Sequence, residues 1–225
     1  MGYDEADPRP QVARFDEFDD FDTLTKAYVD DLSECLARIP GNRVIREIAE
    51  AVWLTLAAGR DVHVAGNGGS ASTSGHLMAD LSLAMGACRG VERCGTVRSL
   101  ADNPALLSAI ANDYGFDVAF ARQVEQQARA GDALLMFSVS GSSPNLLRAG
   151  EAARRNGVRV FAVTGRPGEL SRQASLSYHA AGTSYGRNED VHLAVVHILS
   201  TYIHRSHQAK HAVSAGPSDG SATCG

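Results

Sequence analysis

Two short stretches rich in glycine and serine carry the residues best suited to binding an anion. They read AGNGGSAS at 65–72 and SVSGSSPN at 138–145, and each follows a short apolar run and precedes a segment with helical spacing. Glycine lets the backbone approach a ligand closely, serine adds hydroxyl donors, and a helix start offers unpaired N–H groups with a partial positive charge. Ser143-Pro144 has the order of an N-cap followed by proline at the first helical position. The two stretches together predict a phosphate-binding site.

Neither stretch fits a common nucleotide-binding motif. A Walker P-loop ends in Gly-Lys followed by Ser or Thr, and both stretches lack that ending. The dinucleotide fingerprint also fails, because Gly66-Asn67-Gly68 is not followed by a third glycine at the required place. A single Gly/Ser stretch is more often a simple turn, and the third such stretch, 164–168, is interpreted in this way. Two of them at strand-to-helix junctions favour a small phosphorylated ligand.

A histidine and a carboxylate follow the first stretch at a spacing that suits acid–base chemistry. His76 and Asp80 are four residues apart, so both side chains share one face of the predicted helix. Aldose–ketose isomerisation moves a proton between adjacent carbons through an enediol, and it needs a base, an acid and stabilisation of oxyanion charge. A carboxylate and an imidazole meet the first two needs. Their plainer interpretation is a surface histidine and a solvated acid.

The elements that would position these residues alternate along the chain. Apolar residues at helical spacing predict three helices, over 24–39, 44–58 and 188 to about 207. Short apolar runs predict strands at 61–65, 133–137, 158–163 and, more weakly, 175–179. Strands separated by helices imply parallel crossovers and a sheet covered on both faces, which is the α/β class. Such sheets bind ligands beyond the carboxyl ends of their strands, where both Gly/Ser stretches fall.

The bulk properties are those of one ordinary globular domain. The chain has 225 residues, 44% of them hydrophobic, and its net charge of −5 argues against a nucleic-acid surface. No apolar run reaches the length of a membrane span. Four cysteines without a CxxC pair and an acidic N-terminus indicate a cytoplasmic protein with free thiols. Residues 1–14 and 210–225 are predicted to be flexible tails around a single domain at 15–209.

Four stretches resemble the SIS (sugar isomerase) domain, and more closely its phosphoheptose isomerase branch. They are AGNGGSASTSGHLMADL (65–81), LADNPALLSAIANDYGFDVAF (100–120), GDALLMFSVSGSSPNLLRAGEAARRNGVRVFAVTG (131–165) and NEDVHLAVVHIL (188–199). The resemblance implies a three-layer αβα sandwich with a five-stranded parallel, flavodoxin-like sheet and N-terminal helices. It also implies a homotetramer with active sites at subunit boundaries, and conversion of sedoheptulose 7-phosphate to D-glycero-D-manno-heptose 7-phosphate.

The resemblance assigns roles by position. Ser138, Ser140 and Ser143 would hold the phosphate. Further substrate contacts are implied for Asn67, Gly68, Ser70, Asp102, Asn103, Val139 and Glu189. Asp80 and His197 fall where the family places its acid–base pair. A divalent metal, with zinc as the first candidate, would be bound by His76, Asp80, Glu189 and His197.

Helix geometry limits how these four metal ligands can meet. Glu189 and His197 are eight residues apart, which is about 12 Å of rise in a regular helix. One ion can bridge them only if both side chains reach toward each other or if Glu189 precedes the regular helix. Two imidazoles with two carboxylates suit zinc or another divalent transition metal. In the plainer interpretation, His197 is a core histidine and Glu189 a first-turn acid favoured by the helix dipole.

Four positions depart from the family pattern, which usually has glutamate at Asp80, glutamine at Glu189, aspartate at Gly186 and arginine at Ala84. These changes fit an isomerase for one particular heptose, for example in a secondary-metabolite pathway. The changes at Gly186 and Ala84 also suit a second hypothesis, a non-catalytic SIS-type scaffold like the relatives that bind the bacterial replication initiator. A sugar-phosphate sensing module is the third, and the short acidic N-terminus argues against the DNA-binding domain that accompanies such modules.

Overall fold

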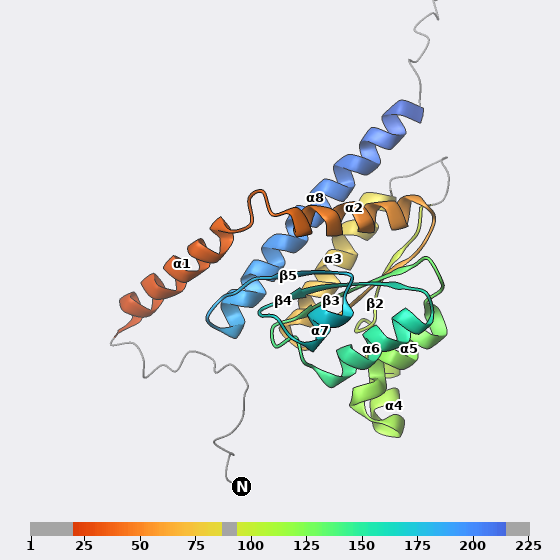
Figure 1. Ribbon diagram of the computed structural model, residues 1–225, viewed down its shortest axis with the longest axis horizontal. Helices are drawn as coiled ribbons and strands as arrows, with labels where there is room; N and C mark the ends of the chain where they lie inside the picture. Colours follow the sequence, from red (N-terminus) through yellow and green to blue (C-terminus); the bar gives the residue numbers. More distant parts are fainter. Residues whose placement is uncertain (1–19, 87–93, 215–225) are drawn as a thin grey trace, which may run out of the picture.

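The computed structural model describes residues 20–86 and 94–214. A parallel five-stranded sheet forms its centre, in the order β2-β1-β3-β4-β5 (Figure 1). The strands are β1 (Val62–Ala65), β2 (Val97–Ser99), β3 (Ala133–Ser138), β4 (Arg159–Thr164) and β5 (Leu176–His179). This is the flavodoxin-like order. The predicted fold class is confirmed.

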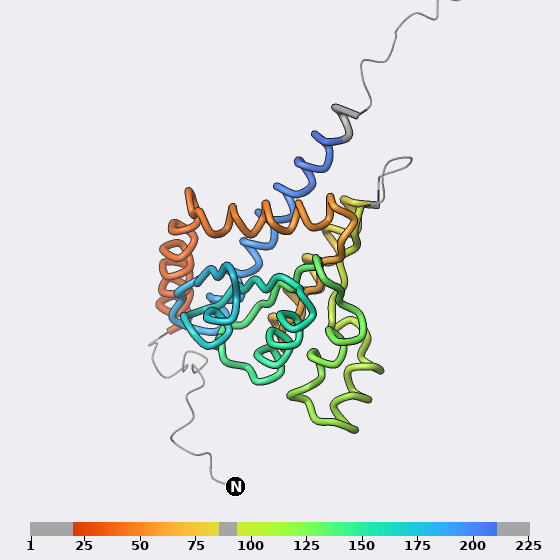
Figure 2. Tube along the Cα trace, turned by 45° about the vertical axis from the view of Figure 1, so that its right-hand side comes forward, coloured from red at the N-terminus to blue at the C-terminus, as the bar shows by residue number. Residues whose placement is uncertain are grey.

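Helices cover both faces of the sheet. One layer contains α1 (Phe21–Ala37), α2 (Arg43–Ala57), α3 (Gly69–Gly86) and α8 (Tyr185–Ser214). The other contains α4 (Pro104–Tyr114), α5 (Ala119–Gln127), α6 (Pro144–Arg155) and α7 (Glu169–Gln173), with a 3₁₀ turn at Phe116–Val118. Both views show the two layers, and they show the end of α8 running out beyond the sheet (Figures 1 and 2). The architecture is therefore a three-layer αβα sandwich.

The central strand β3 separates two apolar cores. Leu135 and Phe137 point into the core under α2, α3 and α8, whereas Leu134 and Met136 point into the core under α5 and α6. All six residues of β3 are buried. Alternation of side chains along a strand that is covered on both sides requires this continuous apolar run. This apolar run made β3 easy to predict. The end of the run also sets the point at which the serine loop begins, at the carboxyl end of β3.

Several element boundaries differ from those predicted. The α1 helix starts earlier because Asp20 caps it, with Asp20 Oδ1 accepting from the Thr23 N–H at 2.7 Å. The short strand β2 was not predicted from the residue pattern. The α8 helix begins at Tyr185 and extends to Ser214, past the predicted start of the C-terminal tail at residue 210. Residues 1–14, the predicted N-terminal tail, lie outside the described residues.

Two further expectations concern thiols and membranes. Cys35 and Cys94 are free thiols, and the other two cysteines lie outside the described residues. Within the described ranges, no helix combines the length and the apolar character of a membrane span.

Three histidines are held where the neutral ring is favoured. His63 and His192 are fully buried, and burial lowers the pKa of His192 to about 4. Burial also lowers the pKa of His63 and of His179. Below about pH 6.5 the unfolded chain therefore binds protons that the folded chain does not. The folding free energy contributed by these rings is present above that pH and is lost as pH falls toward 4.

Replacing His192 by leucine should therefore reduce the loss of stability in acid. In the native protein His192 alone is expected to lower the unfolding free energy by up to about 3 kcal/mol between pH 7 and pH 4. Urea unfolding at pH 7, 6 and 5 should show a shallower pH slope for His192→Leu. His204→Gln, at the surface, serves as the control and should keep the native slope. An unchanged slope in His192→Leu would contradict this account of the buried ring.

Candidate active site

The two Gly/Ser loops meet at the carboxyl ends of two neighbouring strands. They follow β1 and β3, which are hydrogen-bonded neighbours, although β2 lies between them in the sequence. The chain turns to one side after β1 and to the other after β3, so this is the topological switch point where open α/β sheets bind ligands. Asn67 and Asn145 join the loops through two reciprocal amide hydrogen bonds, of 3.0 and 2.8 Å. These two hydrogen bonds therefore hold the loops in a fixed position relative to each other.

A pocket of about 130 Å³ lies between the loops. Its lining residues are Asn67, Ser70, Phe137, Ser138, Val139, Ser140, Ser143, Leu146, Tyr185 and Glu189. Three of the serine hydroxyls form a row, with Oγ–Oγ distances of 3.5 Å between Ser138 and Ser140 and 3.4 Å between Ser140 and Ser143. Most of the substrate-contact residues predicted from the resemblance thus share one pocket.

The hydroxyls in the row are positioned to donate to a ligand. The Ser138 Oγ accepts from the Gly141 N–H at 3.1 Å, and the Ser140 Oγ accepts from the Ser142 N–H at 3.3 Å. Ser143 occupies the N-cap position of α6, but its side chain makes no capping hydrogen bond. With backbone donors on their oxygens, the first two hydroxyls can turn their hydrogens toward an anion. The start of α6 adds its partial positive charge.

Glycines are required where the first loop turns into α3. A Cβ on Gly66 would overlap the backbone carbonyl of Ser70, and Gly68 has a positive φ of 54°. A Cβ on Gly69 would overlap the carboxylate of Glu189, which lies against the first turn of α3. A side chain at Gly66 would require the backbone to shift, one at Gly68 would strain the positive φ, and one at Gly69 would displace the Glu189 carboxylate. The glycines of this motif therefore let neighbouring groups approach the backbone closely and also let the backbone turn.

Glu189 and Tyr185 form the α8 side of the pocket. Burial raises the pKa of the Glu189 carboxyl, and the neighbouring carboxylate of Asp190 raises it further. Tyr185 was not predicted as a site residue, because it lies before the predicted start of the last helix. The signal in the sequence was its spacing of four residues before Glu189, which places both on one face of α8.

A second group of polar residues lies further along α3 and α8, on the outer face. The His76 and His197 Nε2 atoms are 3.0 Å apart, and His76 Nε2 is 3.6 Å from Asp80 Oδ1. Ligand atoms of these three residues all lie within 4.8 Å of one another. His197 is exposed, so it is not a core histidine. The structure brings together the three residues that the sequence analysis linked to acid–base chemistry and metal binding.

Glu189 does not join this group. It lies in the serine pocket, and it belongs to the same regular helix as His197, eight residues earlier. Eight helical residues correspond to about 12 Å of rise along the axis of α8. The structure thus brings together three of the four predicted metal ligands, and the fourth, Glu189, lines the serine pocket.

The three remaining residues fit a divalent metal. Two ligands of a tetrahedral zinc, each at 2.0–2.1 Å, lie roughly 3.3 Å from each other. The observed separations of 3.0 and 3.6 Å bracket that value. Two imidazoles and one carboxylate are also a common ligand set for a catalytic zinc, which keeps its fourth position open. The three ligand atoms lie within 4.8 Å of one another, so the arrangement could hold a metal once they draw together around it.

Three of the predicted substrate contacts, Gly68, Asp102 and Asn103, are not among the residues that line the serine pocket. Asp102 is exposed on the loop after β2, and its Oδ1 would be 3.7 Å from a Cβ on Gly75 of α3. Asn103 caps α4, with its Oδ1 accepting from the Leu106 N–H at 3.0 Å. Asp102 therefore lies against α3 beside Gly75, whereas the side chain of Asn103 is engaged in the helix cap.

The fold and the pocket define a parallel α/β protein with a small polar pocket, suited to a phosphorylated ligand, at the switch point of its sheet. Residues 27–165 match the SIS domain family. The chain is 35% identical over 173 residues to the phosphoheptose isomerase of Akkermansia muciniphila, covering 76% of this chain and 89% of that protein. It is 36% identical over 178 residues to the phosphoheptose isomerase of Rhodospirillum rubrum, covering 77% and 92%.

A solved structure agrees with these relatives. The phosphoheptose isomerase from Francisella tularensis superposes with a TM-score of 0.72 at 26% identity, covering 82% of this chain and 96% of that one. The chain therefore belongs to the SIS domain family and, within it, to the phosphoheptose isomerases. It is an isomerase with the fold that the resemblance implied.

Proposed function

We propose that the protein converts sedoheptulose 7-phosphate to D-glycero-D-manno-heptose 7-phosphate. The observation that carries this proposal is the convergence of the Ser70, Ser138, Ser140 and Ser143 side chains on one pocket. Helices α3 and α8 also line that pocket, and the same two helices carry His76, Asp80 and His197. The relatives named above supply the substrate class. The serine pocket would hold the phosphate and leave the sugar chain directed along α3 and α8.

Helix geometry supports a substrate orientation in which the reacting end reaches the outer group. Ser70 and His76 are six residues apart on α3, which is about 9 Å of rise. A phosphorylated seven-carbon chain is long enough to extend from the pocket toward Asp80 and His197. In this orientation the phosphate fixes one end of the substrate and leaves the carbonyl end free for proton transfer.

The proton transfer would proceed through an enediol. The Asp80 carboxylate would remove a proton from C1 of the ketose, and His197 would donate a proton to the carbonyl oxygen at C2. His197 would then take the proton from the hydroxyl on C1 as Asp80 returns its proton to C2, which leaves the aldose and both residues in their starting states. Positioned acids and bases of this kind contribute about 10²- to 10⁴-fold in rate.

We propose zinc as the metal, which would be held by Nε2 of His76, Nε2 of His197 and one carboxylate oxygen of Asp80. The second oxygen of Asp80 and Nδ1 of His197 would remain for the proton transfers. A bound zinc would supply Lewis-acid stabilisation of charge on the sugar oxygens. The support for this proposal is the spacing of the donor atoms and the exposure of the two histidines on the outer face of α3 and α8.

Metal analysis of the purified protein tests this ligand set directly. We expect inductively coupled plasma mass spectrometry to find close to one zinc ion per chain. The His76→Ala variant should retain little of this zinc. Because imidazole binds metal only when it is neutral, acidifying the buffer should also release the metal. His204→Ala, at the surface of α8, should keep the native content. A His76→Ala variant with full zinc content would place the metal elsewhere.

We also propose that the chain assembles into a tetramer that encloses this outer group. Leu83, seven residues after His76 on α3, is 81% exposed. Ile198 and Tyr202 on α8 are 41% and 38% exposed. These apolar side chains flank the His76–His197 pair, and their burial between copies would stabilise the assembly. Copies packed on this face would enclose the reacting end of the substrate.

A charged residue on the apolar face formed by Leu83, Ile198 and Tyr202 should disrupt the assembly. Leu83→Asp would bury an unpaired carboxylate between copies, at a cost of several kcal/mol. We expect light scattering to show dissociation to smaller species, with loss of isomerase activity. Ser82→Asp, which adds the same charge to the neighbouring exposed position, should assemble normally. An assembled Leu83→Asp protein would show that this face is free in solution.

Direct assay decides between the isomerase and a non-catalytic scaffold. Sedoheptulose 7-phosphate is incubated with the purified, zinc-loaded protein, and NMR follows the appearance of the aldose signals. The scaffold hypothesis is not favoured, because a scaffold has no use for the metal-binding geometry of His76, Asp80 and His197. Lack of turnover across several ketose phosphates would nevertheless falsify the enzymatic proposal.

A further inference from the structure

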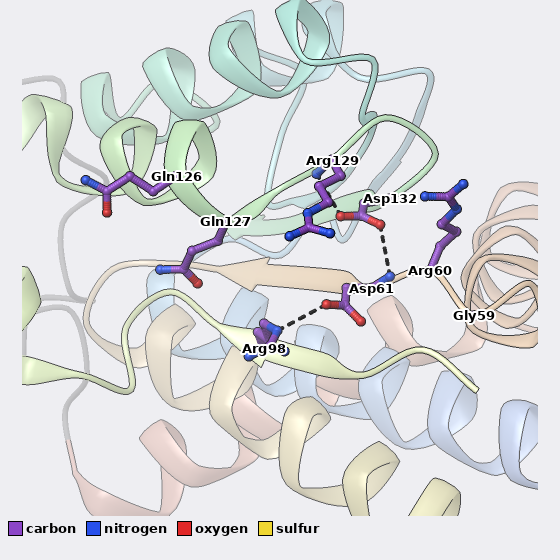
Figure 3. A pocket seen from close by; sticks show the side chains of 8 residues that line it. All are labelled: Gly59, Arg60, Asp61, Arg98, Gln126, Gln127, Arg129 and Asp132. Atoms are coloured by element: carbon purple, nitrogen blue, oxygen red, sulfur yellow. Dashed lines mark hydrogen bonds and ion pairs between the residues drawn. The ribbon is translucent and has the colours of Figure 1, made fainter. Parts of the chain in front are cut away.

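A second, larger pocket lies at the opposite end of the strands from the serine loops. It has a volume of about 490 Å³ and is lined by Gly59, Arg60, Asp61, Arg98, Gln126, Gln127, Arg129 and Asp132 (Figure 3). Asp61 and Asp132 immediately precede β1 and β3, so the pocket faces the amino ends of these strands. The serine loops leave from their carboxyl ends. The two pockets are therefore separate, and the proposed isomerase chemistry makes no use of this one.

The two carboxylates in the pocket are already engaged by protein donors. Asp132 accepts from the backbone N–H groups of Asp61, at 3.0 Å, and of Arg129, at 2.8 Å. Asp61 accepts from the Thr96 N–H at 2.8 Å and pairs with Arg98 Nε at 3.2 Å. Their role in tying the strand ends together is visible in Figure 3. These carboxylates are structural groups with little capacity left for a ligand.

The arginines retain most of their donor capacity. In the described part of the chain, neither Arg60 nor Arg129 has a carboxylate partner for its side chain. Arg98 uses Nε for Asp61 and is 53% exposed. Figure 3 shows Arg129 and Gln127 on one side of the hollow, with Arg98 across from them. Three guanidiniums against two carboxylates give the lining a net charge of +1, in a chain whose net charge is −5.

We propose that this pocket binds a small organic bisphosphate. Guanidinium groups bind phosphate through two parallel hydrogen bonds, and two unpaired arginines provide for two phosphate groups. The side-chain amide of Gln127, beside Arg129 and across from Arg98 in Figure 3, adds a neutral donor and acceptor for a hydroxyl group of the ligand. The volume lies in the range of pockets that enclose metabolites. Gly131, with a φ of 91°, leaves room for the Arg60 side chain, 3.4 Å from its Cβ position.

A competing explanation makes the arginines purely structural. The α2 and α5 helices end beside the pocket, and cations near helix C-termini are stabilising without any ligand. That explanation accounts for positive charge near Arg60 and Arg129. It does not account for the hollow that the side chains surround or for the Gln127 amide beside Arg129. The two explanations differ in one measurable property, which is binding of a phosphorylated molecule.

Calorimetric titration with fructose 1,6-bisphosphate tests the proposal on the native assembly. We expect two classes of site per chain, one in the serine pocket and one in the arginine pocket. The Arg60→Gln/Arg129→Gln variant should weaken the second class at least tenfold, while the KM for the sugar phosphate and kcat stay native. Arg60→Lys/Arg129→Lys keeps the charge but loses the paired hydrogen bonds, so it should give an intermediate loss.

A serine-pocket variant separates this inference from the proposed function. In Ser140→Ala/Ser143→Ala the arginine-pocket binding should persist, although the first class of site is lost. Fructose without phosphates should show no binding to either variant or to the native protein. If the serine variant loses all bisphosphate binding, or if the arginine variant binds like the native protein, the arginine pocket is not a phosphate site.

Discussion

Asp80→Asn is expected to lower kcat by about 10²- to 10⁴-fold, because the amide cannot accept the proton that the reaction moves. The substitution keeps nearly the same shape and hydrogen-bonding reach, and Asp80 is only partly buried. The fold should therefore survive, with a circular dichroism spectrum and melting temperature close to native. The KM for sedoheptulose 7-phosphate should change much less than kcat, since the phosphate is held by a different pocket.

Two controls make this prediction specific. Glu151→Gln removes an exposed carboxylate on α6 and should retain native kcat. Zinc content must be measured in parallel, because Asp80 also belongs to the proposed ligand set. An Asp80→Asn protein that keeps zinc and loses turnover supports the proton-transfer role. One that keeps both zinc and turnover would remove Asp80 from the chemistry.

The fold was largely predictable because buried strands of a parallel sheet have a strong pattern. The observed β1, β3, β4 and β5 lie within one residue of the predicted limits at each end. Strand β2 has only three residues, Val97–Ser99, and its middle residue, Arg98, is exposed. Such a segment has too few apolar side chains to stand out from a loop. Only the resemblance to a family with five strands anticipated it.

The site was predictable as a set of residues but not as a geometry. The Asn67–Asn145 pair joins residues 78 positions apart, and it forms only because β1 and β3 are neighbours in the sheet. The place of Glu189 depended on where α8 begins. Since the helix already starts at Tyr185, Glu189 lies inside it and is carried into the serine pocket, away from His197. Short-range sequence patterns do not predict the contact between Asn67 and Asn145 or the residue at which α8 begins.

The serine row leads to the second large prediction. Ser140→Ala/Ser143→Ala should lower kcat/KM for sedoheptulose 7-phosphate by about 10²- to 10⁴-fold, because each hydrogen bond to a charged group contributes about 1.5–3 kcal/mol. Most of the loss should appear in KM if the phosphate is bound equally in the ground state and the transition state. Competitive inhibition by inorganic phosphate should weaken in the same variant, which ties the effect to the anion.

The same loop provides a matched control for this substitution. Ser142 lies between the two replaced serines, but it is exposed and does not line the pocket. Ser142→Ala removes a hydroxyl from the same backbone segment and should leave kcat/KM within about twofold of native. Equal losses in Ser142→Ala and in the double variant would mean that the loop's conformation matters and its hydroxyl row does not. A selective loss in the double variant would assign the anion to Ser140 and Ser143, since a general distortion of the loop would affect all three positions alike.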